Sequence, residues 1–381
     1  MTIEPTAEVA DTHVELFSHS RKDGAYWYIR FADYGTINPN IIPHPREDDR
    51  YIIVAQEFVR AKHERFNYEV VCDATFDENN TLSCLRPPLM APVAATYSPH
   101  CIGDYTYFNF NIGPHDARVF FGPETPYMVF GSQSNNNCFG QWIQDFRMLY
   151  DWGHWRKATD LFQTATDIQR PPPYHAFEKN YFVFWDASNV MYVHYEISPH
   201  RVFARLAADG SVGQDLGPQA DLHDAPCLKK YLPPKLEKTS IHQATNSLSI
   251  TLCRRSDPSC QVRPSNTFIM AVFHQKRADG SHPVYEPYVM LFRNVAPFEL
   301  HGISRKPFWI HGRRTGFPLD HPYSGDSELM FITSMSWRAH NQKYHGYLDD
   351  MLFLSFGIED AETGGIDVLA EDLLQQLGKC E

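Results

Sequence analysis

The sequence has no long apolar run and no excess of positive charge. No segment approaches the roughly 18 apolar residues of a membrane-spanning helix, and the polar first 25 residues contain no apolar signal-peptide segment. Lys and Arg number 34 against 46 Asp and Glu, so the formal net charge is −12. Because nucleic acids and anionic lipids are bound through clustered basic residues, we expect no contact with nucleic acid or membrane. The chain is either cytoplasmic or, if an N-terminal anchor has been removed, a secretory-pathway protein of the Golgi lumen.

The sequence also has no Cys-x-x-Cys pair, no Cys/His cluster with zinc spacing and no glycine-rich phosphate loop. It lacks a Gly-x-Ser-x-Gly elbow and an Asp-x-Asp motif in the context of a metal-dependent nucleotide-sugar enzyme. We therefore expect neither a metal nor a cofactor. The eight cysteines are Cys72, Cys84, Cys101, Cys138, Cys227, Cys253, Cys260 and Cys380. Cys253 and Cys260 flank a loop that a disulfide can close, and the even number favours an oxidising compartment. The alternative is eight unrelated thiols in a cytosolic protein.

Apolar and aromatic residues are plentiful: 43% of the chain is apolar and 14% aromatic, with 27 Pro against 21 Gly. They fall in short runs bounded by Pro, Gly, Asn or Asp, as in strands. The runs are 25–31, 51–55, 68–72, 118–121, 127–130, 142–150, 181–185, 190–197, 202–206, 248–252, 267–273, 288–292, 329–333 and 351–356. Only Ile366 to Leu377 has helical spacing. We predict an all-β, five-bladed β-propeller over residues 26–381, with a C-terminal helix. Barrel and sandwich folds are the alternatives. Residues 1–25 are expected to form a poorly ordered extension.

Four short motifs carry a resemblance to a known family. They are Asn38-Pro39, the run His115-Asp116-Ala117-Arg118, the segment Glu178 to Phe182, and Phe356-Gly357-Ile358-Glu359-Asp360. Their order and spacing resemble the five-bladed propellers of the mannoside phosphorylases and β-1,2-mannosyltransferases. Segments 138–152 and 241–247 resemble the fungal β-1,2-mannosyltransferases specifically. Two positions depart from the pattern: His115 stands where an acidic residue is usual, and Gln56 where an Arg is often found.

The resemblance implies an inverting mannosyltransferase. Such an enzyme moves mannose from GDP-mannose, its donor substrate, to a mannoside glycan acceptor and forms a β-1,2 linkage. Asp116 is the expected catalytic base for the acceptor hydroxyl. One carboxylate is enough, because a leaving nucleoside diphosphate needs its charge neutralised rather than a proton. Two alternatives remain open: a β-mannoside phosphorylase or hydrolase on the same fold, and an inactive glycan-binding propeller. The departures at His115 and Gln56 are the reason for the second alternative.

The remaining site residues fall into two expected groups. Substrate-binding candidates are Asn38, Gln56, His115, Arg118, Asp145 and Asp360; candidates for binding the donor phosphates are Arg147, Lys179, Arg201 and His274. Each also has an ordinary structural interpretation as a turn residue, an ion-pair partner or a surface charge. Three tryptophans, Trp142, Trp185 and Trp337, can stack on sugar rings, but most such residues belong to the core.

Overall fold

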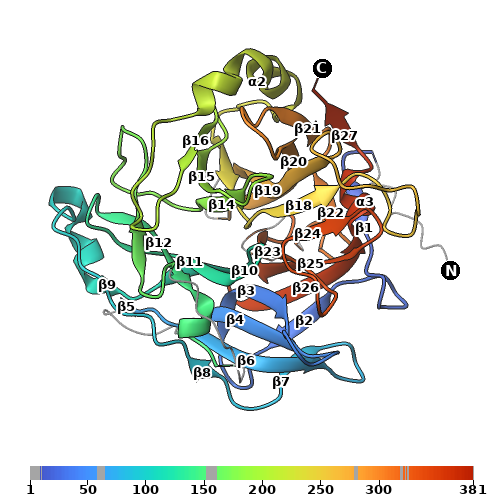
Figure 1. Ribbon diagram of the computed structural model, residues 1–381. Coiled ribbons are helices and arrows are strands. Elements are labelled where there is room, and N and C mark those ends of the chain that lie inside the picture. Colours follow the sequence, from blue (N-terminus) through green and yellow to red (C-terminus); the bar gives the residue numbers. More distant parts are fainter. Residues whose placement is uncertain are drawn as a thin grey trace.

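The chain forms a five-bladed β-propeller, with sheets arranged around a central axis (Figure 1). This computed structural model describes residues 9, 11–57, 65–151, 161–278, 282–317, 321, 323 and 326–380. In each blade the strands run antiparallel to their neighbours, and the first strand lies nearest the axis. The predicted fold class is therefore confirmed.

The blades are numbered in the order in which their innermost strands occur along the chain. Blade 1 contains β3 (Thr36–Pro43), β4 (Tyr51–Glu57), β6 (Glu69–Phe76) and β7 (Leu82–Cys84), with β8 (Leu89–Met90) beside β6. Blade 2 contains β10 (His115–Phe121), β11 (Pro126–Gln133), β12 (Phe139–Asp145) and β13 (Thr166–Ile168). Blade 3 contains β14 (Phe182–Trp185), β15 (Met191–Glu196) and β16 (Val202–Arg205).

The last two blades are completed by the ends of the chain. Blade 4 contains β17 (Thr239–Gln243) and β18 (Leu248–Thr251), which both pair with β19 (Thr267–Arg277), then β20 (Val284–Arg293), β21 (Leu300–Ser304) and β27 (Leu377–Lys379). Blade 5 contains β23 (Met330–Trp337), β25 (Met351–Ile358), β26 (Glu362–Leu369) and β2 (Trp27–Arg30). Because β2 pairs with both β26 and β7, blades 5 and 1 form one continuous sheet.

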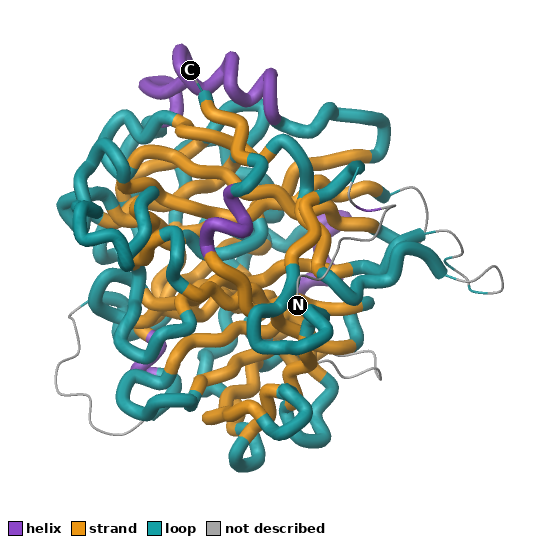
Figure 2. The backbone as a smooth tube through the Cα atoms, turned by 90° about the vertical axis from the view of Figure 1, so that its right-hand side faces the viewer, coloured by secondary structure: helices purple, strands orange, loops and turns teal. Residues whose placement is uncertain are grey.

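The remaining elements connect or cover the blades. They are β1 (Val14–Leu16) paired with β22 (Phe308–Ile310), β5 (Arg65–Phe66) paired with β9 (Asn111–Ile112), β24 (His345–Tyr347) beside β18, the 3₁₀ turns η1 (Gly103–Phe110) and η2 (Phe146–Met148), and the helices α2 (Gly217–Tyr231) and α3 (Ala370–Leu374). Two views place α2 beside the C-terminus, at the edge of the propeller (Figures 1 and 2).

Buried asparagines connect neighbouring blades through the backbone of their innermost strands. Asn40, which is fully buried, donates from Nδ2 to the carbonyl of Ala117 at 2.9 Å and accepts the amide of Val119 at 3.0 Å. Asn246 makes the equivalent pair of bonds, at 3.0 Å each, to the carbonyl and amide of Met335. An asparagine thus fixes blade 1 to blade 2 and another fixes blade 4 to blade 5, because each satisfies two buried backbone groups.

Each predicted strand overlaps a strand of the structure, and the predicted C-terminal helix is present but shorter than expected. Ile366 and Val368 lie in β26, between β25 and β2, and only Ala370–Leu374 is helical. The sequence analysis missed α2, which contains Pro226 and begins with Gly-Pro, residues that usually interrupt or precede a helix. Residues 11–25, expected to be poorly ordered, include β1, whose Leu16 is buried in the core.

Four disulfides join all eight cysteines. The pairs are Cys72–Cys84, Cys101–Cys138, Cys227–Cys380 and Cys253–Cys260. The predicted closure of the 253–260 loop is confirmed, and Cys227–Cys380 ties α2 to the C-terminal strand. Four such bonds are typical of proteins that fold in an oxidising compartment, outside the cytosol. None of the helices in the described part of the chain is long and apolar enough to cross a membrane.

Candidate functional site

The functional residues gather where the innermost strands begin. In β3, β10 and β23, the pairing with the next strand shifts register, between Ile37 and Asn40 in the first strand and between His115 and Arg118 in the second. Asn38 and Asp116 lie inside these two bulges, with φ of +54° and +51°. A bulge redirects the side chain that it carries, and strained backbone of this kind concentrates at functional sites.

Asp116 is the centre of this cluster. Asn38 donates from Nδ2 to Asp116 Oδ1 at 2.7 Å, and Lys179 Nζ lies 3.6 Å from Asp116 Oδ2. The Asp116 side chain is 32% exposed and that of Lys179 is 47% exposed, so a ligand in solution can reach both. Asn38 comes from blade 1, Asp116 from blade 2, and Lys179 from the segment that leads into blade 3.

The two carboxylates of the cluster have pKa values displaced in opposite directions. Burial raises the pKa of the Asp116 carboxyl, but the charges of Lys179 and Arg118 and the hydrogen bond from Asn38 outweigh it, and the pKa lies below its ordinary value. Partial loss of solvent raises the pKa of Asp360, and the negative charge of Asp116 raises it further. Asp360 follows β25 in blade 5. Pairs of carboxyl groups separated in this way divide the base and acid roles in many active sites.

Gln56 and His115 support the backbone of Asp116. Gln56 Oε1 accepts the amide of Asp116 at 3.0 Å, and its Nε2 donates to Asn67 at 3.1 Å. Asn67 Nδ2 in turn lies 3.2 Å from His115 Nε2. Because the amide of Gln56 is 7% exposed and engaged at both ends, it positions Asp116 instead of contacting a ligand. The two departures from the resembled pattern are therefore parts of one hydrogen-bond chain.

Arg118 also acts on the backbone. Its Nε donates to the carbonyl of Ala244 at 2.7 Å and its Nη1 to the carbonyl of Asp116 at 2.6 Å. The bulge removes the i, i+2 alternation that would place the two side chains on one face. The guanidinium does not pair with the Asp116 carboxylate, although its charge lowers the pKa of that group. Its buried Nη2 has no hydrogen-bond partner.

Blade 4 adds cations and a phenol around the same carboxylates. Burial lowers the pKa of His242, and the charges of Lys276 and Lys179 lower it further. The ammonium group of Lys276 lies 5.5 Å from the ring centre of Tyr285. Burial raises the pKa of Tyr285 to about 12, and the charges of Asp360 and Asp116 contribute. With these side chains, all five blades contribute to the cluster.

His274 lies beneath the cluster, uncharged. It is fully buried, its Nε2 accepts the amide of Ile332 at 3.3 Å, and its ring packs 4.6 Å from that of Phe331. Burial lowers its pKa well below the ordinary value. A neutral, buried imidazole has no charge to offer a phosphate, so the geometry does not favour the predicted phosphate contact.

Three predicted residues are not brought to the cluster. Asp145 ends β12 at the far end of blade 2, fully buried, and its carboxylate pairs with Arg147 at 2.6 Å. Arg201 is 1% exposed, pairs with Asp224 at 2.8 Å, and packs between aromatic rings. Asp145 ends β12, Arg147 lies in η2 and Arg201 precedes β16. Their structural ion pairs correct the expected placement of these side chains in the pocket.

The sequence analysis missed five residues of the cluster, one of which is Lys276. Glu69 is fully buried below Asp116 and accepts the amide of Ala117 at 3.3 Å. Burial raises its pKa to about 8. Asn67, His242 and Tyr285 were missed as well. His242 lies within segment 241–247 of the resemblance, which was the one available signal. Among the described residues, no group of three His, Cys, Asp or Glu side chains is arranged to hold a metal ion.

Comparisons with known proteins find structural likeness without sequence relatives. No family model matches the chain, and no curated protein matches it. A glycosyl hydrolase from Bacteroides ovatus is similar at 10% identity, over 96% of this chain and 92% of that one, with a TM-score of 0.44. The β-1,2-mannobiose phosphorylase from Listeria innocua is similar at 11% identity, over 95% and 96%, with a TM-score of 0.46. The catalytic domain of the Coprinopsis cinerea GH62 α-L-arabinofuranosidase is similar at 9% identity, over 91% and 97%, with a TM-score of 0.41. The function is therefore argued from the residues around Asp116.

Proposed function

We propose that this chain is a carbohydrate-active enzyme that moves a mannosyl group between a hydroxyl oxygen of a glycan and a phosphate oxygen. The observation that carries the proposal is the ionised, solvent-accessible Asp116, held by Asn38 and 3.6 Å from Lys179. A positioned carboxylate exchanges the proton of a sugar hydroxyl. The ammonium group beside it neutralises the charge of a phosphate in the same step. The choice of mannose rests on the motif resemblance.

Inorganic phosphate is the partner that the site favours, which makes the enzyme a β-mannoside phosphorylase. Three cations influence the described part of the cluster: Lys179 and the buried Arg118 act on Asp116, and Lys276, together with Lys179, acts on His242. Such a set suits one phosphate group. In the cleavage direction, phosphate attacks the anomeric carbon, the glycosidic oxygen takes a proton, and mannose 1-phosphate and the shortened glycan leave. Asp116 gives that proton in cleavage and takes it back from the glycan hydroxyl in synthesis. Asp360, whose pKa is raised, is the acid from which Asp116 is protonated before cleavage.

Transfer from GDP-mannose is the second candidate, favoured by the lowered pKa of Asp116. A carboxylate that is ionised in the free enzyme is ready to accept the proton of an acceptor hydroxyl, and the departing diphosphate needs no acid. Two of the four residues predicted to bind that diphosphate, Arg147 and Arg201, are engaged elsewhere. The transferase is therefore the weaker of the two candidates.

A pair of reactions separates the candidates. The protein is incubated with β-1,2-mannobiose and phosphate, and mannose 1-phosphate is followed by ³¹P NMR; in parallel, GDP release from GDP-mannose is followed with mannobiose as acceptor. Asp116→Asn is expected to lower the active reaction by about 100- to 10,000-fold, whereas Asp209→Asn, in an exposed turn, leaves it unchanged. Full activity of folded Asp116→Asn would refute the role of Asp116. Absence of both products would refute the proposed reaction.

A further inference from the structure

A cavity lies at the opposite ends of the innermost strands from the Asp116 cluster. It has a volume of about 930 Å³, near the upper end of the usual range for small-molecule sites. Its lining includes Pro123, which follows β10, Trp185, which ends β14, and Ala339, which follows β23. Asp116 stands at the start of β10, and seven residues of strand extend about 20 Å. The cavity is therefore separate from the Asp116 cluster.

The charged groups in the cavity wall are already satisfied. Arg255 forms two hydrogen bonds of 2.7 Å to the carboxylate of Asp350. Lys343 donates to the carbonyl of Glu124 at 3.0 Å. Asp186 accepts two backbone amides, at 2.8 and 2.9 Å. Each of these groups is hydrogen-bonded, and the carboxylates of Asp186 and Asp350 balance the charges of Arg255 and Lys343. The wall therefore favours no ionic ligand of either sign.

The wall contains two histidines, and one of them, His345, is neutral. His345 Nε2 lies 2.8 Å from the hydroxyl of Thr251. Burial lowers the pKa of His345, and the neighbouring Arg255 lowers it further. His345 therefore contributes a hydrogen-bonding group without a charge.

Aromatic rings and uncharged hydrogen-bonding groups make up much of the remaining wall. Trp185, Tyr344 and Tyr347 supply rings, and Asn189, Asn294, Asn341, Gln342, Ser249 and Thr267 supply amides and hydroxyls. Asn294 is 8% exposed, and its buried Oδ1 has no hydrogen-bond partner. A buried amide oxygen left without a donor is costly.

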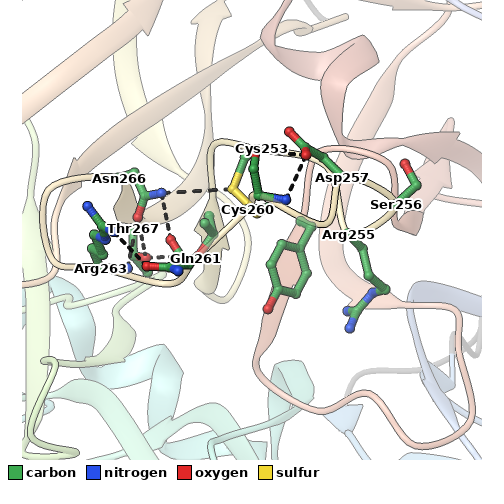
Figure 3. Close-up of a disulfide and its surroundings, with 12 residues drawn as sticks. Cys253, Arg255, Ser256, Asp257, Cys260, Gln261, Arg263, Asn266 and Thr267 are labelled. Atoms are coloured by element: carbon green, nitrogen blue, oxygen red, sulfur yellow. Dashed lines mark hydrogen bonds between the residues drawn. A yellow bond between two sulfur atoms is a disulfide. The ribbon is translucent and has the colours of Figure 1, made fainter.

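The rim of the cavity is a loop held by a disulfide. Cys253–Cys260 closes the loop, and Asn266 donates to the carbonyl of Gln261 at 2.9 Å behind it (Figure 3). The loop carries Arg255, and Val262 just beyond it is exposed; both line the cavity. Because the disulfide and this hydrogen bond hold the rim in place, binding of a ligand costs little conformational entropy in the rim.

We propose that this cavity binds a neutral oligosaccharide, at a site separate from the Asp116 cluster. The partly exposed ring of Tyr347 packs against a sugar ring, and uncharged amides and hydroxyls bond sugar hydroxyls, with no ion needed for recognition. The site does not depend on the reaction proposed for Asp116. It would hold a second stretch of a glycan, or a second glycan chain, while the first is at Asp116.

Binding of three trisaccharides tests the site. Mannotriose, xylotriose and maltotriose are used as probes in saturation-transfer NMR and calorimetry, up to about 10 mM. Ala187→Trp fills the cavity from its exposed rim, and Ser188→Trp, on the same loop but outside the lining, is the matched control. We expect at least one probe to bind, about tenfold more weakly to Ala187→Trp, and equally well to Ser188→Trp and Asp116→Asn.

The proposal is overturned by either of two results. One is that none of the three trisaccharides binds the unmodified protein. The other is that binding survives in Ala187→Trp and disappears in Asp116→Asn, which would place all glycan binding at the Asp116 cluster. Melting temperatures of Ala187→Trp and Ser188→Trp establish that both variants are folded. In Asp116→Asn, activity tests the proposed reaction and probe binding tests this site, so the two proposals can fail independently.

Discussion

Replacing the buried Glu69 by Gln should make the stability of the protein much less dependent on pH. Glu69 is fully buried beneath Asp116, its Oε1 accepts the amide of Ala117, and its Oε2 has no partner. Burial raises its pKa from 4.5 to about 8, and the charge of Asp116 contributes. Gln retains the acceptor and the shape but cannot titrate.

The sign and size of the effect follow from the two pKa values. The folded state holds the proton of Glu69 more tightly than the unfolded chain, so its contribution to stability is complete below pH 4.5 and is lost as the pH rises toward 8. At about 1.36 kcal/mol per pKa unit, the free energy of unfolding should fall by about 3 kcal/mol between pH 5 and pH 8 because of this one group. Glu69→Gln removes that fall, since every other titrating group is shared by both proteins.

Urea unfolding at several pH values between 5 and 8, with the disulfides intact, measures the difference. Glu78→Gln, in an exposed turn, is the control and should follow the unmodified protein. If the free-energy difference between Glu69→Gln and the unmodified protein stays constant within about 1 kcal/mol over this range, Glu69 does not hold a proton at neutral pH and the reasoning fails.

Three further predictions concern the support of the site and the closure of the propeller. Gln56→Leu removes the acceptor for the Asp116 amide; we expect about a tenfold loss in kcat with little change in melting temperature, measured in the reaction that Asp116 supports. Asn40→Ala removes the acceptor of the buried Val119 amide and leaves the carbonyl of Ala117 only the 3.3 Å bond from Arg118; we expect a cost of about 2 kcal/mol in urea unfolding. Cys227→Ser removes a disulfide between residues 153 positions apart, and Cys253→Ser removes one between residues 7 positions apart. By loop-closure entropy, the free energy of unfolding should fall by about 5 and about 2.5 kcal/mol, respectively. Equal losses in melting temperature would contradict this.

Strands were predictable because a strand buried on both faces is a short run of apolar and aromatic residues in the sequence. The run 190–197 consists of strand-forming residues throughout, and β15 occupies Met191–Glu196 within it. Helical spacing misled at Ile366 for the same reason: an inner strand covered on both sides has apolar residues at every offset, including the helical ones. The helix α2 could not be predicted, because its stability comes from packing and from Cys227, while its own residues include Pro226.

Site residues that belong to a motif could be predicted from the sequence. Site residues whose role comes from being buried in the fold could not. Asn38, Asp116 and Lys179 lie together, as the order of the motifs implied. Glu69 belongs to an ordinary strand, and only the fold places it under β10. Arg201 shows the converse: a cation with no neighbouring acid in sequence is paired by the fold with Asp224 on a helix.

The charge of the whole chain and the charge at the site act in opposite directions. A net charge of −12 repels an anion at long range, whereas Lys179 and Lys276 attract it within the cluster. Salt screens exposed charges beyond about 8 Å at physiological ionic strength, so added salt weakens the repulsion over the surface more than the contacts inside the site. If the partner of the reaction is phosphate, its association should therefore change little, or rise, with added salt. A steep loss of affinity with salt would mean that more exposed cations contribute than Lys179 and Lys276.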